Sequence, residues 1–346
     1  FVAAEAGTTE PPVTTQPPVT TPPPEDDEPS AESATLTVDE DGFLSIGNPG
    51  TPYSDGLDEF PDLLEVDSNL TYDFGENGPS ATTPFTWLVD ELQTDLSTAG
   101  ANIFYELSSD GLTLIAHTGD PEIEDDRVFV LTLNDIESGG YSFRLLRPLD
   151  HDSVNTEDNI PLNFGYTIQD ADGDTATSNL EAIVNDDSPV VAATGVSVDE
   201  TAGVVDDVFT QVTDTGTITA LFGADGQGVT ALNIVGNDGG SWDSTTSTYT
   251  GPGGAYTLVF DLDAGTYAYT QTAALDHPDG SNPDDLLSYN FTATVTDGDG
   301  DEDTADFSLT VNDDGPEYAS TPHDSFLANE PGTSVVGDLN IDFGAD

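Results

Sequence analysis

The 346-residue chain contains no cysteine and no methionine, and only three of its residues, Arg127, Arg144 and Arg147, are basic. Without cysteine, neither disulfide bonds nor thiolate ligands can hold the fold together, so oxygen atoms are the metal ligands that remain. No apolar run approaches the roughly 20 residues that a membrane-spanning helix needs. We therefore expect neither a disulfide-stabilised scaffold nor direct insertion into a membrane.

The charge of the chain is strongly one-sided, with 68 acidic residues and a formal net charge of -65. The charge disfavours nucleic acid and anionic membranes as partners because they carry the same sign of charge. The acidic residues gather beside Gly, Asn and Ser at the ends of apolar runs, where Ca²⁺ is the natural counter-charge. A hydrophobic content of 35%, with 16 Phe and 11 Tyr, supplies several small cores. The composition thus predicts a folded chain rather than a disordered one.

Two segments of the chain, ending at Pro189 and at Pro316, match each other landmark by landmark. Each contains, in the same order, Gly-x-Tyr, Leu-Asp-His, an alternating apolar run, Asp-x-Asp-Gly-Asp and Asn-Asp-Asp-x-Pro. Self-similarity of this kind predicts a tandem array of similar modules.

Recurring markers set the boundaries of these modules. Val-Asp-Glu ends at Glu40 and again at Glu200, and a Phe-Gly pair recurs at Phe74, Phe222 and Phe343. The first residues are rich in Pro and Thr, a composition that favours extended polyproline II and cannot bury a core. We predict a Thr/Pro-rich linker or stalk at 1–34, a first module at 35–190 with an insertion around 50–125, a second module at 191–316, and the start of a third at 317–346.

The dominant period within the modules is two, which is typical of half-buried strands. Tyr256, Leu258 and Phe260 alternate with polar positions before a Gly turn, and the Asp-rich turns are flanked by similar runs. Many short strands between Gly, Asp and Asn turns predict an all-β fold of tandem antiparallel immunoglobulin-like β-sandwich modules, preceded by the extended Pro/Thr segment. The stretch 85–93 fits either a short helix or an inserted strand.

Carboxylates recur at alternate positions of the turn between the last two strands of each module. Alternate Asp residues in a tight turn can direct several hard oxygens at one centre, as Ca²⁺ requires. An EF-hand is disfavoured because Thr175 stands where its loop needs Gly and because the flanks are strands. These turns can also be solvated hairpin tips, but their recurrence favours calcium. The predicted ligands are Asp170, Asp172 and Asp174 in the first module, and Asp297, Asp299 and Asp301 in the second.

A second acidic cluster, Asn-Asp-Asp, ends the last strand of each module, with Asp186 and Asp187 in the first copy and Asp313 and Asp314 in the second. Six or seven residues of strand, about 20 Å at the strand rise, separate it from the Asp-rich turn. The two clusters of one module therefore cannot share an ion. We predict that Asp186 and Asp187 approach Asp297, Asp299 and Asp301 across the junction, joined by Asp199 or Glu200.

Other constellations carry weaker signals. His151 and His277 follow Leu-Asp in both copies without a partner for acid-base catalysis, so a structural turn is the preferred interpretation. Trp87 and Trp242 are expected in the cores because large aromatic residues dominate cores. A glycosidase would need two acids in a single cleft, whereas these acids lie in repeated turns. We therefore predict a non-enzymatic protein.

The order Leu-Asp-His, aromatic strand, Asp-Ala-Asp-Gly-Asp-Thr and Val-Asn-Asp-Asp-x-Pro resembles the repeats of giant bacterial adhesins exported by type I secretion, the RTX or VCBS-type surface proteins. The resemblance covers about 127–190 and 256–316 and is poor over 50–125. It implies immunoglobulin-like extenders with calcium at the junctions, which project a binding domain from the bacterial cell surface for adhesion or biofilm formation. The family's Gly-rich nonapeptide calcium repeats are absent from this sequence.

Two kinds of partner remain open at this stage. In the extender, each module contacts the neighbouring modules of the same chain. The alternative is a structural subunit of an extracellular filament or surface layer, in which copies associate end to end or by strand exchange. Both place the chain outside the cell, and neither requires an active site.

Overall fold

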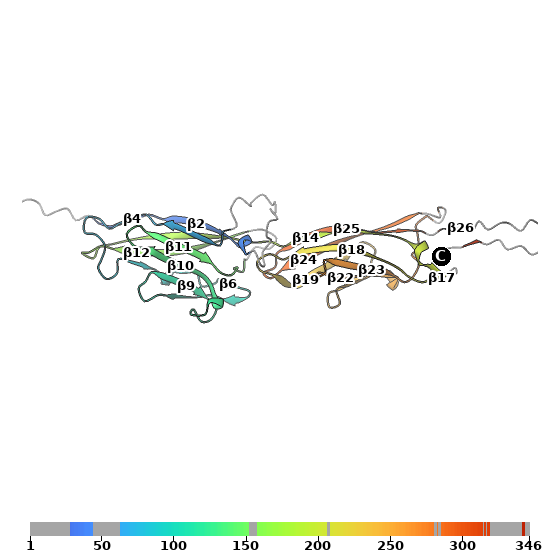
Figure 1. The fold of residues 1–346 in the computed structure, drawn as a ribbon, viewed down its shortest axis with the longest axis horizontal. Helices are drawn as coiled ribbons and strands as arrows, with labels where there is room; N and C mark the ends of the chain where they lie inside the picture. The colour runs from blue at the N-terminus through green and yellow to red at the C-terminus, as the bar shows by residue number, and fades with distance from the viewer. Residues whose placement is uncertain are drawn as a thin grey trace, which may run out of the picture.

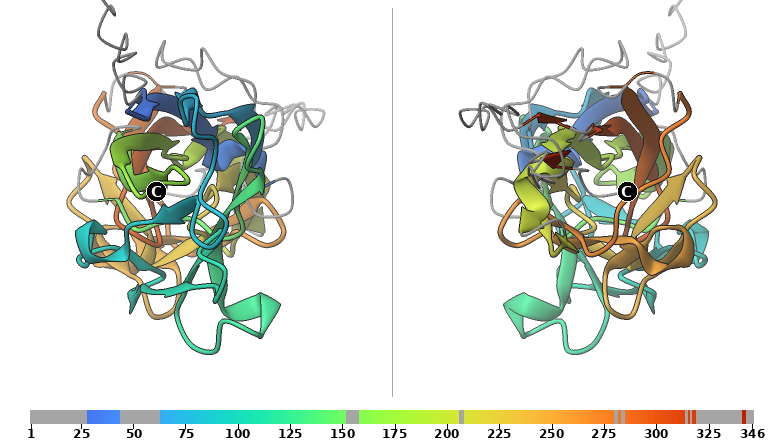
Figure 2. Two further views of the ribbon diagram at one scale, coloured as in Figure 1. Left: turned by 90° about the vertical axis from the view of Figure 1, so that its left-hand side faces the viewer. Right: turned by 90° about the vertical axis from the view of Figure 1, so that its right-hand side faces the viewer.

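The computed structural model describes residues 28–43, 63–151, 158–205, 208–279, 282, 285–313, 315, 317–318 and 341–342. Most of the predicted linker and most of the predicted third module lie outside the described residues, as does Asp314. The described part is all-β and forms two immunoglobulin-like sandwiches that lie end to end along the long axis (Figure 1). Seen along that axis from either end, one sandwich lies behind the other (Figure 2).

The first sandwich packs a four-stranded sheet against a five-stranded sheet. The smaller sheet has the order β2 (Ala34–Asp39), β13 (Thr175–Asn185), β12 (Asn159–Gln169) and β5 (Phe85–Trp87). The larger sheet has the order β3 (Glu65–Asn69), β11 (Gly140–Leu145), β10 (Arg127–Asp135), β9 (Thr113–His117) and β8 (Phe104–Leu107). Two short ribbons pair β1 (Ser30–Ala31) with β4 (Tyr72–Asp73) and β6 (Ser97–Thr98) with β7 (Ala101–Asn102). Three 3-10 turns are η1 (Glu40–Gly42), η2 (Val89–Glu91) and η3 (Glu124–Asp126).

The second sandwich repeats this plan. Its four-stranded sheet has the order β15 (Val196–Asp199), β25 (Glu302–Asn312), β24 (Leu286–Asp297) and β19 (Gln227–Gly236). Its six-stranded sheet has the order β14 (Val190–Ala193), β18 (Val212–Leu221), β23 (Thr266–Gln271), β22 (Tyr256–Asp261), β21 (Thr248–Thr250) and β20 (Ser241–Asp243). The remaining elements are η4 (Glu200–Gly203), η5 (Pro252–Gly254), β16 (Val204–Val205) with β17 (Val208–Phe209), and β26 (Glu317–Tyr318) with β27 (Ile341–Asp342).

The shared strand order corrects the predicted insertion around 50–125. Within the described part of that stretch, β3, β5, β8 and β9 occupy the same places in their sheets as β18, β19, β20 and β21 of the second sandwich. These strands are therefore part of the module itself. The sequence match fails there because a strand needs only alternation and turns, which many different residues supply.

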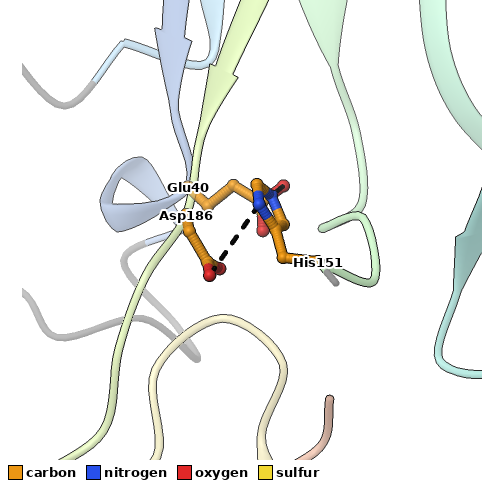
Figure 3. A group of neighbouring side chains, drawn as sticks. All are labelled: Glu40, His151 and Asp186. Carbon is orange, nitrogen blue, oxygen red and sulfur yellow. Dashed lines mark ion pairs between the residues drawn. The ribbon is translucent and has the colours of Figure 1, made fainter. Parts of the chain in front are cut away.

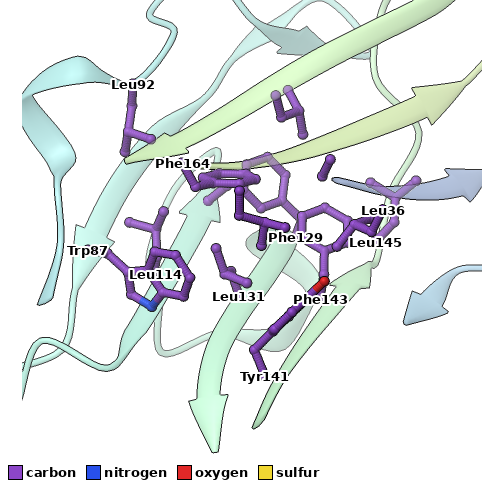
Figure 4. Close-up of a cluster of buried hydrophobic side chains, with 14 of the residues drawn as sticks. Leu36, Trp87, Leu92, Leu114, Phe129, Leu131, Tyr141, Phe143, Leu145 and Phe164 are labelled. Atoms are coloured by element: carbon purple, nitrogen blue, oxygen red, sulfur yellow. The ribbon is translucent and has the colours of Figure 1, made fainter. Parts of the chain in front are cut away.

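Each sandwich has its own hydrophobic core, and the cores share no residue. The first core draws on residues from Leu36 to Val184 and the second on residues from Val191 to Val311. Alternate residues of the strands face inward, so Phe129, Phe143 and Phe164 meet between the two sheets of the first sandwich (Figure 4). Burying each such side chain stabilises the fold by roughly 1.5–3 kcal/mol. Each sandwich thus holds itself together without the other.

The stretch 85–93 resolves into a strand followed by a 3-10 turn. Phe85 and Trp87 of β5 are buried, and the Trp87 Nε1 donates to the Leu112 carbonyl at 3.0 Å. Trp87 lies in the core as expected. Trp242 is half-buried and packs edge-on against Phe260, with ring centroids 5.6 Å apart.

The two long strands at the end of each module separate its acidic clusters. β13 and β25 are each 11 residues long, which corresponds to about 36 Å at the strand rise. This length exceeds the predicted one and strengthens the argument that the clusters of one module cannot share an ion. We call the end with the Asp-rich turn the tip pole and the end where the last strand finishes the exit pole.

Candidate metal centre at the junction

The exit pole of the first sandwich is built around Glu40. The parallel pairing of β2 with β13 ends at Asp39 opposite Asn185, so Glu40 in η1 lies beside the start of the linker. Its side chain is fully buried, and its Oε1 accepts a hydrogen bond from the Leu149 amide at 2.9 Å. Glu40 thereby ties the Val-Asp-Glu marker to the Leu-Asp-His marker.

His151 completes this pole (Figure 3). Its Nε2 lies 3.7 Å from Glu40 Oε1, and its Nδ1 lies 2.6 Å from Asp158 Oδ1 and 3.8 Å from Asp186 Oδ2. Desolvation lowers the pKa of His151, but the hydrogen bonds and charges of Glu40 and Asp158 outweigh it and raise the pKa above its ordinary value. His151 lies in the loop that follows β11, and its raised pKa favours a positive charge within an acidic cluster.

The tip pole of the second sandwich is a turn stabilised by hydrogen bonds within the turn itself. Asp297 Oδ1 accepts hydrogen bonds from the amides of Gly300 at 3.0 Å and Asp301 at 2.7 Å. Gly300 has a φ of 117°, which only glycine adopts at little cost. Asp299 therefore stands at the outermost point of the turn. Asp225, from the turn after β18, lies beside it.

The linker brings these two poles together. The His151 amide donates to Asp299 Oδ2 at 3.0 Å, a direct bond from the first sandwich to the second. Carboxylate oxygens of Asp186, Asp225 and Asp299 all lie within 4.8 Å of one another. Asp187 packs on Gly223, where a Cβ would stand only 2.8 Å from the Asp187 Cγ. The structure thus places Asp186 and Asp187 against the tip pole that contains Asp297, Asp299 and Asp301.

Packing so many carboxylates together raises their pKa values. Desolvation, followed by repulsion from Glu40 and Asp299, raises the pKa of Asp186 to about 12. Desolvation and the neighbouring Asp41 raise the pKa of Asp187 to about 9, and desolvation with Glu40 raises that of Asp225 to about 9. Desolvation and Asp299 raise the pKa of Asp297 to about 8. The imidazolium of His151 alone does not balance this charge.

The donor atoms fit a hard divalent cation. Among the described residues, no hydrogen bond reaches Oε2 of Glu40, Oδ2 of Asp186 or Oδ2 of Asp225. Calcium takes 6 to 8 oxygen ligands at about 2.3–2.6 Å, including carboxylates that bind through one or both oxygens. Asp186, Asp225 and Asp299 form one group across the junction, which shares Asp186 with the group at Glu40 and Asp299 with the group of Asp297 and Asp301. These carboxylates would hold one or more ions, which would neutralise the buried charge. His151 is held by ion pairs and is not needed as a ligand.

The expectation that Asp199 or Glu200 joins this junction is wrong, because both lie at the far end of the second sandwich. Glu200 Oε1 accepts from the Leu275 amide at 2.9 Å, and Glu200 Oε2 lies 3.7 Å from His277 Nε2. Glu200, His277 and Asp313 form a compact group there. Asp199 is exposed and accepts from the Thr201 amide at 2.9 Å. The junction contains Glu40 instead, because the Val-Asp-Glu marker of each module lies at the exit pole of that same module.

The remaining predicted turn lies at the opposite end of the first sandwich. Asp170, Asp172 and Asp174 each bring a carboxylate oxygen within 4.8 Å of the others. Desolvation raises the pKa of Asp170, but hydrogen bonds, including those from the amides of Gly173 and Asp174, outweigh it and lower the pKa. Its counterpart Asp297 shows the opposite pKa shift, because desolvation and the neighbouring Asp299 outweigh the hydrogen bonds from the turn's amides.

Sequence reasoning missed Glu40, His151 and Asp225 as members of the junction. Each belongs to a repeated marker, namely Val-Asp-Glu, Leu-Asp-His or Phe-Gly, that had served only as a landmark of the repeat or of its boundaries. Their recurrence in the same order in both modules was the available signal. The strand register that brings them together was not.

Comparisons with known proteins find one family model and distant structural matches. Residues 240–310 match a family model described as "Domain of unknown function (DUF5801)". Among solved structures, mouse cadherin-23 repeats EC22-24 match at 13% identity, with 87% of this chain and 75% of that chain covered and a TM-score of 0.25. Drosophila N-cadherin EC1-4 matches at 14% identity, with 85% and 53% covered and a TM-score of 0.23. No curated protein matches, and no helix in the described residues is long and apolar enough to cross a membrane.

Proposed function

We propose that this chain is a non-enzymatic extracellular repeat region of a bacterial surface adhesin, in which calcium at the junction locks consecutive sandwiches into an extended rod. The observation that carries the proposal is the meeting of Asp186 with Asp225 and Asp299 at the junction. Two sandwiches contribute to one acidic site, so a bound cation fixes their relative orientation. Such an array would project a binding domain away from a cell surface.

The electrostatics give the cation a mechanical role. Without it, the carboxyl groups of the two poles must either repel each other or take up protons, and the linker is left to hold the sandwiches together. At free calcium roughly 100 times the dissociation constant, each site adds about 2.7 kcal/mol to the docked state. Extracellular modules commonly bind calcium at about 0.1 to 1 mM, so an extracellular setting would keep the junction locked.

The arrangement of acids favours a structural role over catalysis. Every cluster of carboxylates or histidines that stands close enough to hold a metal lies at a pole of a sandwich within the described residues. The same clusters recur in both modules, and a duplicated feature along an array usually serves structure or adhesion.

A calcium titration tests the proposal directly. We expect calcium to raise the melting temperature and to lengthen the particle in small-angle scattering. Asp299→Asn should weaken both responses, whereas Asp172→Asn, which alters the matching position of the other tip pole, should leave the lengthening intact. A particle whose dimensions ignore calcium would refute the proposal.

The filament alternative retains one supporting observation. The exit pole at Glu200 repeats the exit pole at Glu40, down to the hydrogen bond from a Leu amide at 2.9 Å in each. Copies of the chain could therefore dock end to end through the same half-sites that meet at the junction. Regular polymers under electron microscopy in calcium would select the filament, and monomeric rods would select the extender.

A further inference from the structure

The exit pole of the second sandwich buries three acids around one imidazole. Glu200, Asp285 and Asp313 are 0%, 7% and 8% exposed, and the side chain of His277 is 2% exposed. The backbone fixes this group, since the Asp313 amide donates to the Asp285 carbonyl at 3.0 Å and the Asp279 amide donates to Asp285 Oδ2 at 2.9 Å. One imidazole cannot balance three buried acids, so this pole needs further positive charge.

The imidazole of His277 is buried in this pole without a hydrogen bond to any described residue. The nearest acids lie at ion-pair distances, with Nδ1 3.2 Å from Asp285 Oδ1 and Nε2 3.7 Å from Glu200 Oε2. At the first exit pole, by contrast, His151 Nδ1 lies only 2.6 Å from Asp158 Oδ1. A buried imidazole that lacks a hydrogen bond, inside a group of acids, indicates a position for a cation.

The donor set of this pole differs from that of the junction. At the first exit pole, Asp186 also belongs to a group made entirely of carboxylates, which reaches across the junction. Within the described part of the chain, the aligned Asp313 belongs only to the group that it forms with Glu200 and His277. A cation held by that group therefore has an imidazole nitrogen among its neighbours. Calcium takes oxygen ligands, whereas imidazole suits zinc and related transition metals.

We infer that Glu200, His277 and Asp313 form a zinc site at the exit pole of the second sandwich. The site goes beyond the proposed function, because calcium has no part in it. One ligand atom from each residue lies within 4.8 Å of the other two. Tetrahedral zinc ligands at about 2.0–2.2 Å stand about 3.3–3.6 Å apart, close to the 3.7 Å between His277 Nε2 and Glu200 Oε2. Three protein ligands leave the fourth position to water.

Asp285 is the positioning residue of this zinc site. A metal-bound histidine almost always donates its other ring N–H to a carboxylate, a carbonyl or water, which fixes the tautomer and the orientation of the ring. Asp285 Oδ1, at 3.2 Å from His277 Nδ1, is in place for this contact and leaves Nε2 facing Glu200. Glu200 is itself held by the Leu275 amide, which donates to its Oε1 at 2.9 Å. The ion would thus join the residues that follow β15, β23 and β25.

Zinc binding to the full chain after chelation tests this inference, with Zn²⁺ alone as the probe. We expect one zinc per chain in native mass spectrometry, retained in millimolar calcium, and an imidazole nitrogen at about 2.0–2.1 Å in zinc X-ray absorption spectra. His277→Gln should lower the zinc affinity in calorimetry about 100-fold. Asp285→Asn should lower it about tenfold, and Asp285→Glu should restore most of it. His117→Gln, which removes a histidine outside every metal-holding group of described residues, is the matched control and should leave the affinity unchanged.

The possible outcomes separate the zinc site from the calcium junction. Spectra with oxygen ligands alone, or equal zinc affinity in His277→Gln and His117→Gln, would overturn the inference and leave the proposed function standing. Zinc binding lost in His151→Gln but kept in His277→Gln would place the ion at the first exit pole and overturn it as well. If His277→Gln does not fold, the spectrum of the unsubstituted chain and the affinity of Asp285→Asn decide. A particle whose length ignores calcium would remove the proposed function and leave the zinc site standing.

Discussion

Replacing Asp225 by Asn should change the stability of the junction in opposite directions with and without calcium. The substitution has a precedent within the chain, since Asn77 occupies the corresponding place in the first sandwich. In the absence of calcium, Asp225 is a half-buried carboxyl group whose Oδ2 receives no hydrogen bond from a described residue. Its pKa is raised from 3.8 to about 9 by desolvation and by repulsion from Glu40 and Asp299. An amide removes this repulsion and keeps the shape of the side chain.

The magnitude follows from the pKa. Holding an isolated group protonated at pH 7 when its ordinary pKa is 3.8 costs roughly 4 kcal/mol. Neighbouring carboxylates share this cost and partial exposure screens it, so we expect a gain of about 1–3 kcal/mol for Asp225→Asn in a chelator. In saturating calcium the variant lacks one charged ligand. A tenfold loss of affinity would then lower stability by about 1.4 kcal/mol.

Chemical denaturation in chelator and in millimolar calcium measures both arms. Asp263→Asn, in the exposed turn between β22 and β23, removes the same charge away from the poles and controls for the lower net charge. The expected pattern is a stabilised variant in chelator and a destabilised variant in calcium, with the control changed equally in both. A shift of the same sign and size under both conditions would refute the cation site and leave only general charge repulsion.

Three further predictions follow from the same geometry. Gly223→Ala should lower stability by about 2–3 kcal/mol and uncouple the sandwiches, because its Cβ would overlap Asp187 in addition to the strain of a positive φ. Gly226→Ala has the same strain with nothing within 4 Å and should cost only about 1 kcal/mol in denaturation experiments. In chelator, scattering should show a more compact junction near pH 5 than near pH 9. The pKa values of Asp187 and Asp225 are raised to about 9, so their stabilising contribution is fully present below their ordinary pKa and is lost as the pH rises through 9. Glu40→Gln keeps an acceptor for the Leu149 amide but should weaken calcium binding at the junction about tenfold by calorimetry, whereas Glu200→Gln should leave that affinity unchanged.

Much of the fold could be predicted because it depends on local patterns. Alternation at Tyr256, Leu258 and Phe260 became β22, and the Asp-rich turns became tips of two long hairpins. The strands over 63–117 were mistaken for an insertion because their sequences show no recognisable match to those of their counterparts. Their equivalence is visible only in sheet order, which is set by contacts between segments far apart in the chain.

The junction was predictable to the level of two clusters but not to the level of its members. The length of β13 alone places Asp170 and Asp186 at opposite ends of the first sandwich. Assigning Glu40 rather than Glu200 required the parallel pairing of β2 with β13, which aligns Asp39 with Asn185. A parallel pair between segments so far apart leaves no signature in either strand, because register depends on the partner as much as on the strand itself.

The two poles differ in how they are prepared for an ion, and this difference gives the array its direction. At the tip pole, one oxygen of Asp297 is used to hold its own turn, so the outer carboxylates are fixed before any partner arrives. At the exit pole, Glu40 and His151 are held by the Leu149 amide and by Asp158 inside the first sandwich. Both half-sites therefore form within separately folded cores. Because a tip pole lacks the Glu-His pair and an exit pole lacks the Asp turn, we expect a tip pole to dock onto an exit pole and not onto another tip.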